Sequence, residues 1–288
     1  MCGLTCKIFE ELATPFLLTR PRIICAPLSN SLARLTAVSL HPVSSRSITE
    51  VVYICNRYQS VKTPIEYKEA LRRRLSKFEE PKSEQKNHDL RTAFSQHRQT
   101  YTDQATMENS GEVMACLWSA LMRTPHVKEI TISPDFDSFL DGQRYTRYFL
   151  EPVPAYNESF LLMARVMSLT NTQVQDLIIE ENDDPYRSEV GVNGALFRGM
   201  SNIDLIHFCS AFRGLRNIMI TVDDTEVDGW MTGHLARILS GATDLEQLYI
   251  HGYYGTFKYP QNIFWVLQHG VVWPLWFSST LLWIKKIF

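Results

Sequence analysis

Acidic side chains follow three of the apolar segments in this sequence, and they are the residues best suited to bind a cationic partner. The eight that lie closest to the apolar segments are Asp135, Asp137, Glu180, Glu181, Asp183, Asp184, Asp223 and Asp224. If the apolar segments are parallel strands, all eight acids leave the sheet at one edge, where open α/β sheets usually bind their ligands. Their charges would then add up to a docking surface for a basic segment of another protein.

Two other interpretations of these acids stay open. A divalent metal ion could bind among the Asp pairs, but this requires oxygen ligands that converge on one point, which spacing alone does not show. The acids could also belong to ordinary solvated loops. An Asp to Asn series over Asp183, Asp184, Asp223 and Asp224 would remove the docking hypothesis if binding of the target stayed unchanged.

The sequence holds none of the short motifs that mark common enzymes. GxSxG, HExxH, GxGxxG and the Walker A pattern are absent, so hydrolase and nucleotide chemistry have no support. The eight His never recur at i, i+4 and the six Cys form no CxxC, so no zinc ligand set is visible. We therefore expect no cofactor, no metal and six reduced thiols.

The overall charge excludes nucleic acid as the main partner. The chain has 29 Lys and Arg against 31 Asp and Glu, so it has no general basic field to hold a polyanion. The N-terminus lacks the charged and apolar pair of segments found in signal peptides, which predicts a cytoplasmic or nuclear protein. A membrane location is not expected, because the Trp-rich segment 265–284 contains seven residues unsuited to a firm span; a tail anchor is the alternative.

The elements that would position the acids come from a repeated pattern of the form apolar-x-x-apolar-x-apolar. It occurs at residues 48–53, 127–132, 174–179, 215–220 and 245–250. Each copy fits a short strand that turns alternate side chains into a core, and each follows a stretch with helical periodicity, such as Leu205, Phe208 and Phe212. Repeated helix–strand units predict an α/β fold with parallel strands, each preceded by a covering helix.

The pattern is that of leucine-rich repeats in degenerate form. The position eight residues after the first apolar residue favours Asn or Cys in such repeats, and here it holds Asn56, Asp135, Asn182, Asp223 and Tyr253. The unequal spacing of the copies predicts insertions after the strands and hence an irregular leucine-rich-repeat-like solenoid. An ordinary α/β domain is the alternative.

Several short segments of the sequence resemble fungal F-box proteins. Residues 4–20 are similar to the last helix of the F-box in that family. Residues 48–53, 125–132 and 242–250 are similar to segments that follow the F-box in those proteins. The resemblance implies a non-catalytic substrate-recognition subunit of an SCF-type ubiquitin ligase, in which the F-box binds a Skp1-type adaptor and the repeats bind a target protein. The positions that carry over to the adaptor surface are Leu4, Phe9, Leu12 and Phe16. Because the sequence begins within the last F-box helix, the resemblance implies only part of that surface.

Five regions follow from these patterns. Residues 1–24 are expected to be the F-box-like remnant, 25–56 the first helix–strand unit, 57–109 a charged insertion that is partly helical and partly mobile, and 110–262 the repeats. Residues 263–288 would be a truncated repeat with a Trp-rich tail. Two alternative functions stay open: an α/β enzyme with a metal or acidic site at the strand ends, and a truncated gene product without function.

Overall fold

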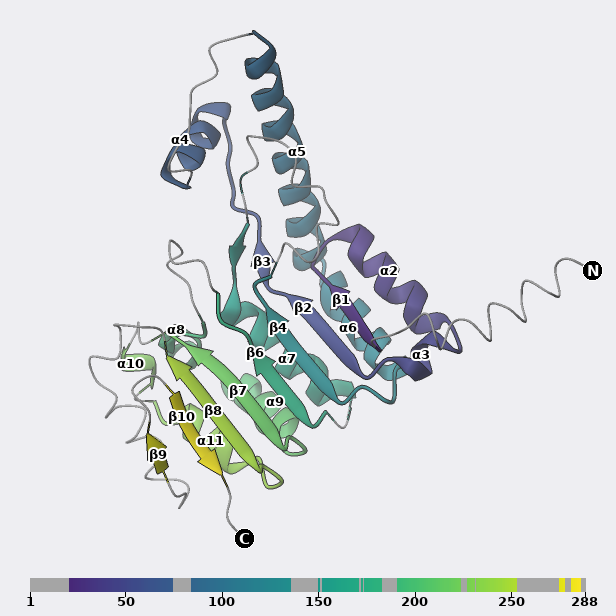
Figure 1. The fold of residues 1–288 in the computed structure, drawn as a ribbon, viewed down its shortest axis with the longest axis vertical. Coiled ribbons are helices and arrows are strands. Elements are labelled where there is room, and N and C mark those ends of the chain that lie inside the picture. Colours follow the sequence, from purple (N-terminus) through teal and green to yellow (C-terminus); the bar gives the residue numbers. More distant parts are fainter. Residues whose placement is uncertain are drawn as a thin grey trace, which may run out of the picture.

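The fold is known from a computed structural model of the 288-residue chain (Figure 1). The structure describes residues 21–74, 84–135, 150, 152–170, 172, 174–182, 191–223, 227–230, 232–252, 275–277 and 281–285.

One open sheet organises the described part of the chain. Its first six strands are parallel and follow one another in sequence order: β1 (Arg22–Cys25), β2 (Glu50–Ile54), β4 (Glu129–Ser133), β6 (Asp176–Ile179), β7 (Asn217–Val222) and β8 (Gln247–Gly252). Two antiparallel strands, β10 (Leu281–Lys285) and then β9 (Leu275–Phe277), continue the sheet beyond β8. We call the edge where the parallel strands begin the start edge and the edge where they end the finish edge.

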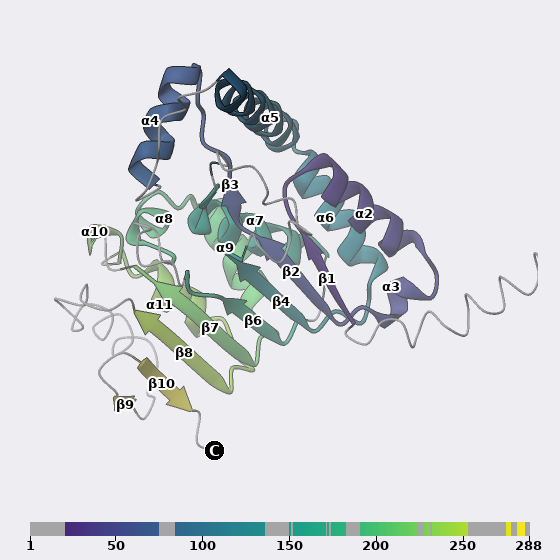
Figure 2. The same ribbon diagram turned by 45° about the horizontal axis from the view of Figure 1, so that its top comes forward.

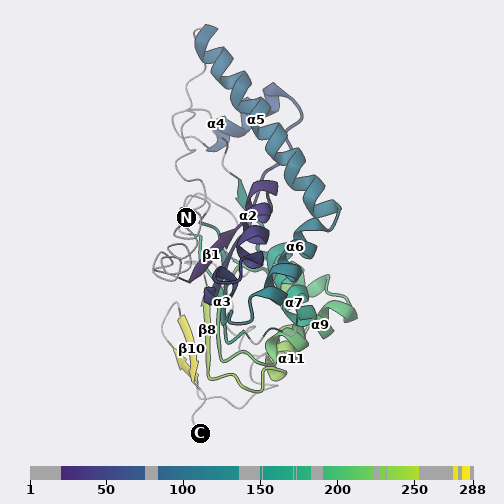
Figure 3. The ribbon, with the colours of Figure 1, turned by 90° about the vertical axis from the view of Figure 1, so that its right-hand side faces the viewer.

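A layer of helices covers one face of the sheet (Figure 3). The helices that precede the strands are α2 (Ser29–Leu40) with the short α3 (Ser44–Ser47), α6 (Glu112–Arg123), α7 (Tyr156–Thr170), α9 (Asn202–Phe212) and α11 (His234–Ser240). Two short helices, α8 (Gly194–Arg198) and α10 (Val227–Trp230), pack on each other near the ends of β7 and β8 (Figure 1). The predicted α/β class with a mostly parallel sheet is therefore confirmed, and in the described ranges each parallel strand after β1 is preceded by a helix. The leucine-rich-repeat assignment stays a prediction.

The register of the strands matches the sequence pattern position by position. Val51, Ile130, Leu177, Ile218 and Leu248 occupy the fourth position, and each is the register partner of the next. All five are buried at 2% exposure or less, and the first and sixth positions are buried as well. The apolar positions of the pattern thus form three buried rows beneath the helix layer, and this is where the hydrophobic core lies.

The start edge repeats one hydrogen-bond arrangement. A single carbonyl accepts the amides of the second and third pattern positions of the next unit; for example, the Lys128 carbonyl accepts from Gln175 (2.7 Å) and Asp176 (3.0 Å). The carbonyls of Pro21, Thr49, Gln175 and Arg216 do the same for their neighbours. Because every buried backbone group needs a partner, this shared geometry fixes how each strand enters the sheet.

A helical arm stands away from the sheet where the sequence predicted a partly mobile insertion. It consists of α4 (Pro64–Arg74) and the 26-residue α5 (Glu84–Asn109) (Figures 1 and 2). Tyr67 and Leu71 of α4 pack with Leu90 and Ala93 of α5 in a separate small core. Helix α5 forms because its buried apolar residues, though widely spaced in a polar sequence, lie on one helix face. The division of 57–109 into a helical and a mobile part stays a prediction.

The base of the arm is tied to the sheet by Arg57, which lies in the small two-stranded sheet of β3 (Asn56–Arg57) and β5 (Val153–Pro154). Its guanidinium forms an ion pair with Glu108 of α5 and donates to the Tyr53 hydroxyl (3.1 Å) and the Cys55 carbonyl (3.1 Å). Burial raises the pKa of the Tyr53 phenol to about 12, so it stays neutral.

Two ends of the chain differ from the predicted regions. Strand β1 begins at Arg22, inside the range 1–24 that was predicted as the end of an F-box-like helix; residues 1–20 lie outside the described residues. In the range 263–288, the described residues form the antiparallel strands β9 and β10. The truncated repeat with a Trp-rich tail stays a prediction. None of the helices in the described ranges is both long and apolar enough to cross a membrane.

Candidate functional site

Only part of the predicted acidic docking surface at the finish edge belongs to the described residues. Asp137, Asp183, Asp184 and Asp224 lie outside the described residues, as do the adaptor candidates Leu4, Phe9, Leu12 and Phe16. The other four acids, Asp135, Glu180, Glu181 and Asp223, do follow their strands at the finish edge, as predicted.

These four acids have different surroundings. Asp135 is exposed, whereas Asp223 is only 5% exposed. Glu180 accepts a short hydrogen bond from the Ser133 hydroxyl on the neighbouring strand. Glu181 lies 2.9 Å from Nδ1 of His251 on β8, and both side chains are about three-quarters buried. Glu180 and Glu181 are therefore held by contacts within the protein and Asp223 is buried, and the role of the acids in docking stays a prediction.

A metal site at this edge receives no support from the residues in view. Within the described ranges, no group of three or more His, Cys, Asp or Glu side chains is placed to hold a metal ion. The Ser133–Glu180 and Glu181–His251 contacts each connect one strand unit to another, so these carboxylates have structural partners within the fold.

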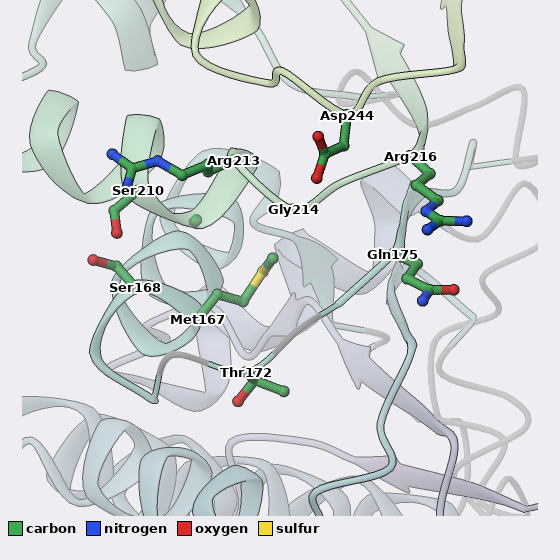
Figure 4. A pocket seen from close by; sticks show the side chains of 10 residues that line it. Met167, Ser168, Thr172, Gln175, Ser210, Arg213, Gly214, Arg216 and Asp244 are labelled. Atoms are coloured by element: carbon green, nitrogen blue, oxygen red, sulfur yellow. The ribbon is translucent and has the colours of Figure 1, made fainter.

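A cavity of about 360 Å³ lies at the opposite, start edge (Figure 4). It is formed where α7, α9 and α11 turn into β6, β7 and β8. Its walls come from Met167, Ser168, Thr172, Gln175, Ser210, Ala211, Arg213, Gly214, Arg216 and Asp244. Ser168 and Ser210 lie in the last turns of α7 and α9, while Gln175 and Arg216 lie just before β6 and β7. Three neighbouring helix–strand units thus build one polar cavity, and its location follows from their register.

The charges around the cavity are only partly paired. Arg216 lies 3.8 Å from Glu246, and both side chains are about half exposed. Arg213 and Asp244 have no ion-pair partner among the described residues; the carboxylate of Asp244 accepts only a long hydrogen bond (3.4 Å) from Thr243. One positive and one negative charge are therefore left for a ligand or for solvent.

A Ser–His contact beside the cavity raises the question of catalysis. The Ser168 hydroxyl lies 3.0 Å from Nδ1 of His207, which joins α7 to α9. The cavity lies at the C-terminal ends of these helices, which present carbonyls rather than the N–H donors that stabilise an oxyanion. The contact therefore fits a link between two helices better than a nucleophile and its base.

The sheet face opposite the helix layer carries a third group of polar side chains. Glu50, Glu129 and Asp176 occupy the third pattern position on neighbouring strands and are half-buried. Glu50 forms an ion pair with Arg22 (3.1 Å). Partial burial, together with repulsion from Glu50 and Asp176, raises the pKa of the Glu129 carboxyl. The sequence analysis assigned these three acids no role, although counting alternate residues along each strand would have placed them on this face.

Comparison with known proteins gives one relative. The chain is 23% identical over 162 residues to an F-box protein of Arabidopsis thaliana, over 49% of this chain and 35% of the relative. The chain therefore matches about a third of that protein. The comparison hints at the F-box family and at a protein-interaction role. It supports neither the fungal origin nor the leucine-rich repeats that the sequence resemblance implied.

No family model matches the chain, and no solved structure matches it either.

Proposed function

We propose that this chain is a non-catalytic protein-recognition module of the F-box type, whose leucine-rich-repeat-like units present a binding face to a target protein. The observation that carries the proposal is the register of the five pattern copies. Because equivalent residues are paired from β2 to β8, the third and fifth positions of every strand gather on the one face that lies opposite the helix layer.

That face has the mixed character of a recognition surface. The third positions carry Glu50, Glu129 and Asp176 toward the N-terminal side of the sheet. The fifth positions toward β8 are apolar or aromatic, and Met219 of β7 is 36% exposed beside the half-buried Tyr249 of β8. Exposed apolar side chains next to a row of acids suit a partner segment with both basic and apolar residues.

A pair of matched variants tests this face. Met219→Lys places a charge on the face opposite the helices, whereas Ile206→Lys places one on α9, where Ile206 is 66% exposed. Partners would be captured with the full chain as bait, cross-linked and identified by mass spectrometry. We expect Met219→Lys to remove specific partners and Ile206→Lys to keep them. Capture of the same partners by all three proteins would contradict the proposal.

Adaptor binding needs its own experiment, because the residues concerned lie outside the described ranges. The purified chain would be mixed with a purified Skp1-type adaptor and run on gel filtration, with the double variant Phe9→Ala and Phe16→Ala as comparison. We expect a complex with the native chain and none with the variant. If the native chain forms no complex, its role is that of a recognition module outside an SCF-type ligase.

A further inference from the structure

We propose that the outer surface of the helix layer is an interface between two copies of this chain, related by a two-fold axis that runs across helices α6, α7 and α9. This surface and the sheet face that carries Met219 lie on opposite sides of the molecule (Figure 3), so the proposal does not depend on the protein-recognition function. Its apolar side chains, its internal ion pair and the charges at its two ends all suit a second copy.

Large apolar side chains are exposed on three neighbouring helices. They are Trp118 and Met122 on α6, Leu169 on α7, and Ile203 and Ile206 on α9, and each is between 44% and 68% exposed. Helix α7 packs against both α6 and α9, and Figure 3 shows the three helices side by side in the layer. Trp118 and Met122 are four residues apart and Ile203 and Ile206 three apart, so each pair lies on one side of its helix. We call these five residues the outer helix face.

The area of the outer helix face suits an interface between proteins. A large apolar side chain has roughly 150–250 Å² of surface, so the exposed fractions amount to about 500 Å². This value is near the upper end for the largest apolar patch of a monomer, roughly 300–600 Å², and is most of the roughly 800 Å² that one partner contributes to a stable complex. The partly buried Leu161 and Leu162 of α7 add to it. With a rim of polar residues, the face reaches the area that a stable dimer needs.

The charged side chains between α7 and α9 already neutralise each other. Arg165 of α7 donates two hydrogen bonds (2.8 and 2.6 Å) to one carboxylate oxygen of Asp204 on α9. The middle of the surface therefore has no net charge. A strongly basic or acidic partner would find no opposite charge there, and an anionic membrane surface would find no cluster of Lys and Arg. An apolar surface without net charge in its middle instead suits a second copy of itself.

The two ends of the surface carry opposite charges. The first turns of α6 and α7 contain Glu112 and Glu158, whereas the last turn of α6 contains Arg123, and Arg213 follows the last residue of α9. All four residues are exposed. A two-fold axis across the helices makes the helices of the two copies antiparallel, so the acidic end of each copy meets the basic end of the other. The helix dipoles favour the same arrangement. Charge complementarity thus selects an antiparallel dimer, in which Glu112 faces Arg123 of the second copy.

Sedimentation equilibrium of the full chain would test the proposal. We expect a dimer of the 33.3 kDa chain that dissociates on dilution, with a Kd on the order of micromolar. Ile203→Glu and Met122→Glu each place a carboxylate in the interface, and each should weaken dimerisation at least about thirtyfold. Ile65→Glu is the matched control, because Ile65 is as exposed as Ile203 but lies on the arm; it should dimerise as the native chain does. Circular dichroism would show that each variant is folded. A native chain that is monomeric at about 100 µM, or a folded Ile203→Glu that dimerises like the native chain, would overturn the proposal.

A charge exchange on α6 tests the antiparallel arrangement. Glu112→Lys alone and Arg123→Glu alone each bring like charges together across the interface, and each should weaken dimerisation about fivefold. The double variant Glu112→Lys and Arg123→Glu exchanges the two charges and should restore the native Kd. Dimerisation that is strengthened by Glu112→Lys alone, or that is no stronger in the double variant than in the single ones, would overturn the two-fold arrangement.

Discussion

The two edges of the parallel sheet are built by different rules. At the start edge, every unit enters through the same pair of hydrogen bonds to one carbonyl of its neighbour, as Lys128 illustrates. At the finish edge, each strand continues differently: β2 leads into β3 and the arm, whereas β7 forms a bridge between Val222 and Val192 and leads to α10. All units therefore enter the sheet in the same way at the start edge, whereas the chain leaves each strand differently at the finish edge.

The difference teaches where this fold tolerates variation. A change in length before a strand would shift its register and turn its buried side chains to the opposite face. An insertion after a strand costs little, because the closure entropy of a loop grows only slowly with its length. The arm of α4 and α5, with its own core, is an insertion of this kind.

The largest expected effect compares two glycines, one at each edge. In Gly229→Ala, the added methyl group would overlap the backbone carbonyl of Gly194, so α8 and α10 must separate. We expect the free energy of unfolding to fall by about 2–3 kcal/mol in urea titrations. Gly214→Ala at the start edge is the control, since its methyl group would lie 3.8 Å from the Val174 carbonyl, an ordinary contact. Equal losses in both variants would contradict the comparison.

Removal of the charge at the base of the arm has the next largest effect. Arg57→Met leaves the Glu108 carboxylate and the Tyr53 hydroxyl without their shared partner, and the Arg57 side chain is only 15% exposed. We expect a loss of about 2 kcal/mol and faster hydrogen exchange in α5. Arg73→Met, whose side chain is 79% exposed and 3.9 Å from Glu69, should change neither quantity. Unchanged exchange in α5 after Arg57→Met would show that the arm is held elsewhere.

A smaller, pH-dependent effect is expected at Asp204 near the beginning of α9. Burial would raise the pKa of this carboxyl, but hydrogen bonds from Ser201 and Arg165 outweigh it and lower the pKa. A pKa lower in the folded than in the unfolded chain means that the carboxylate stabilises the fold above about pH 4, and that this contribution fades as the pH falls through the folded pKa.

We therefore expect Asp204→Asn to lower the free energy of unfolding by about 1 kcal/mol at pH 7 and by progressively less toward pH 3. Urea titrations at three pH values would measure it. A difference that grows on acidification would contradict this account of the Arg165–Asp204 pair.

The smallest effect is a gain at the start edge. The pKa of Glu129 is raised, so its carboxylate disfavours the fold at neutral pH, and the penalty disappears as the pH falls below the unfolded pKa. We expect Glu129→Gln to raise Tm at pH 7 by about 1–2 °C and to have little effect near pH 3. A lower Tm at pH 7 would show that Glu129 has a stabilising partner on this face.

The sequence predicted the repeated helix–strand units of this fold and missed the elements that depart from the repeat. The buried rows that contain Ile130 and Ile218 were predictable, because burial on one face imposes a period of two within each strand. Strand β1 was missed because the first apolar position of its pattern is taken by Arg20. Helix α5 was missed because its apolar residues are few and widely spaced in a polar sequence.

The candidate sites were less predictable than the strands. The acids of the finish edge were placed at the correct edge, but no spacing shows that Asp223 is buried or that Glu181 contacts His251. The cavity of the start edge depends on turns from three units, and its residues Thr172, Arg213 and Asp244 all lie more than 30 residues apart in the sequence. Such a convergence depends on packing, which the residue types alone do not encode.

The register of the strands is the central claim, and disulfide trapping tests it most directly. Met219 and Tyr249 are register partners on the face opposite the helices, whereas Ile250 points into the core. Under mild oxidation, we predict that the pair Met219→Cys and Tyr249→Cys forms a disulfide, and that the pair Met219→Cys and Ile250→Cys does not, with the native chain as the control for its own cysteines. Cross-linking of the second pair in preference to the first would contradict the register and the surfaces that depend on it.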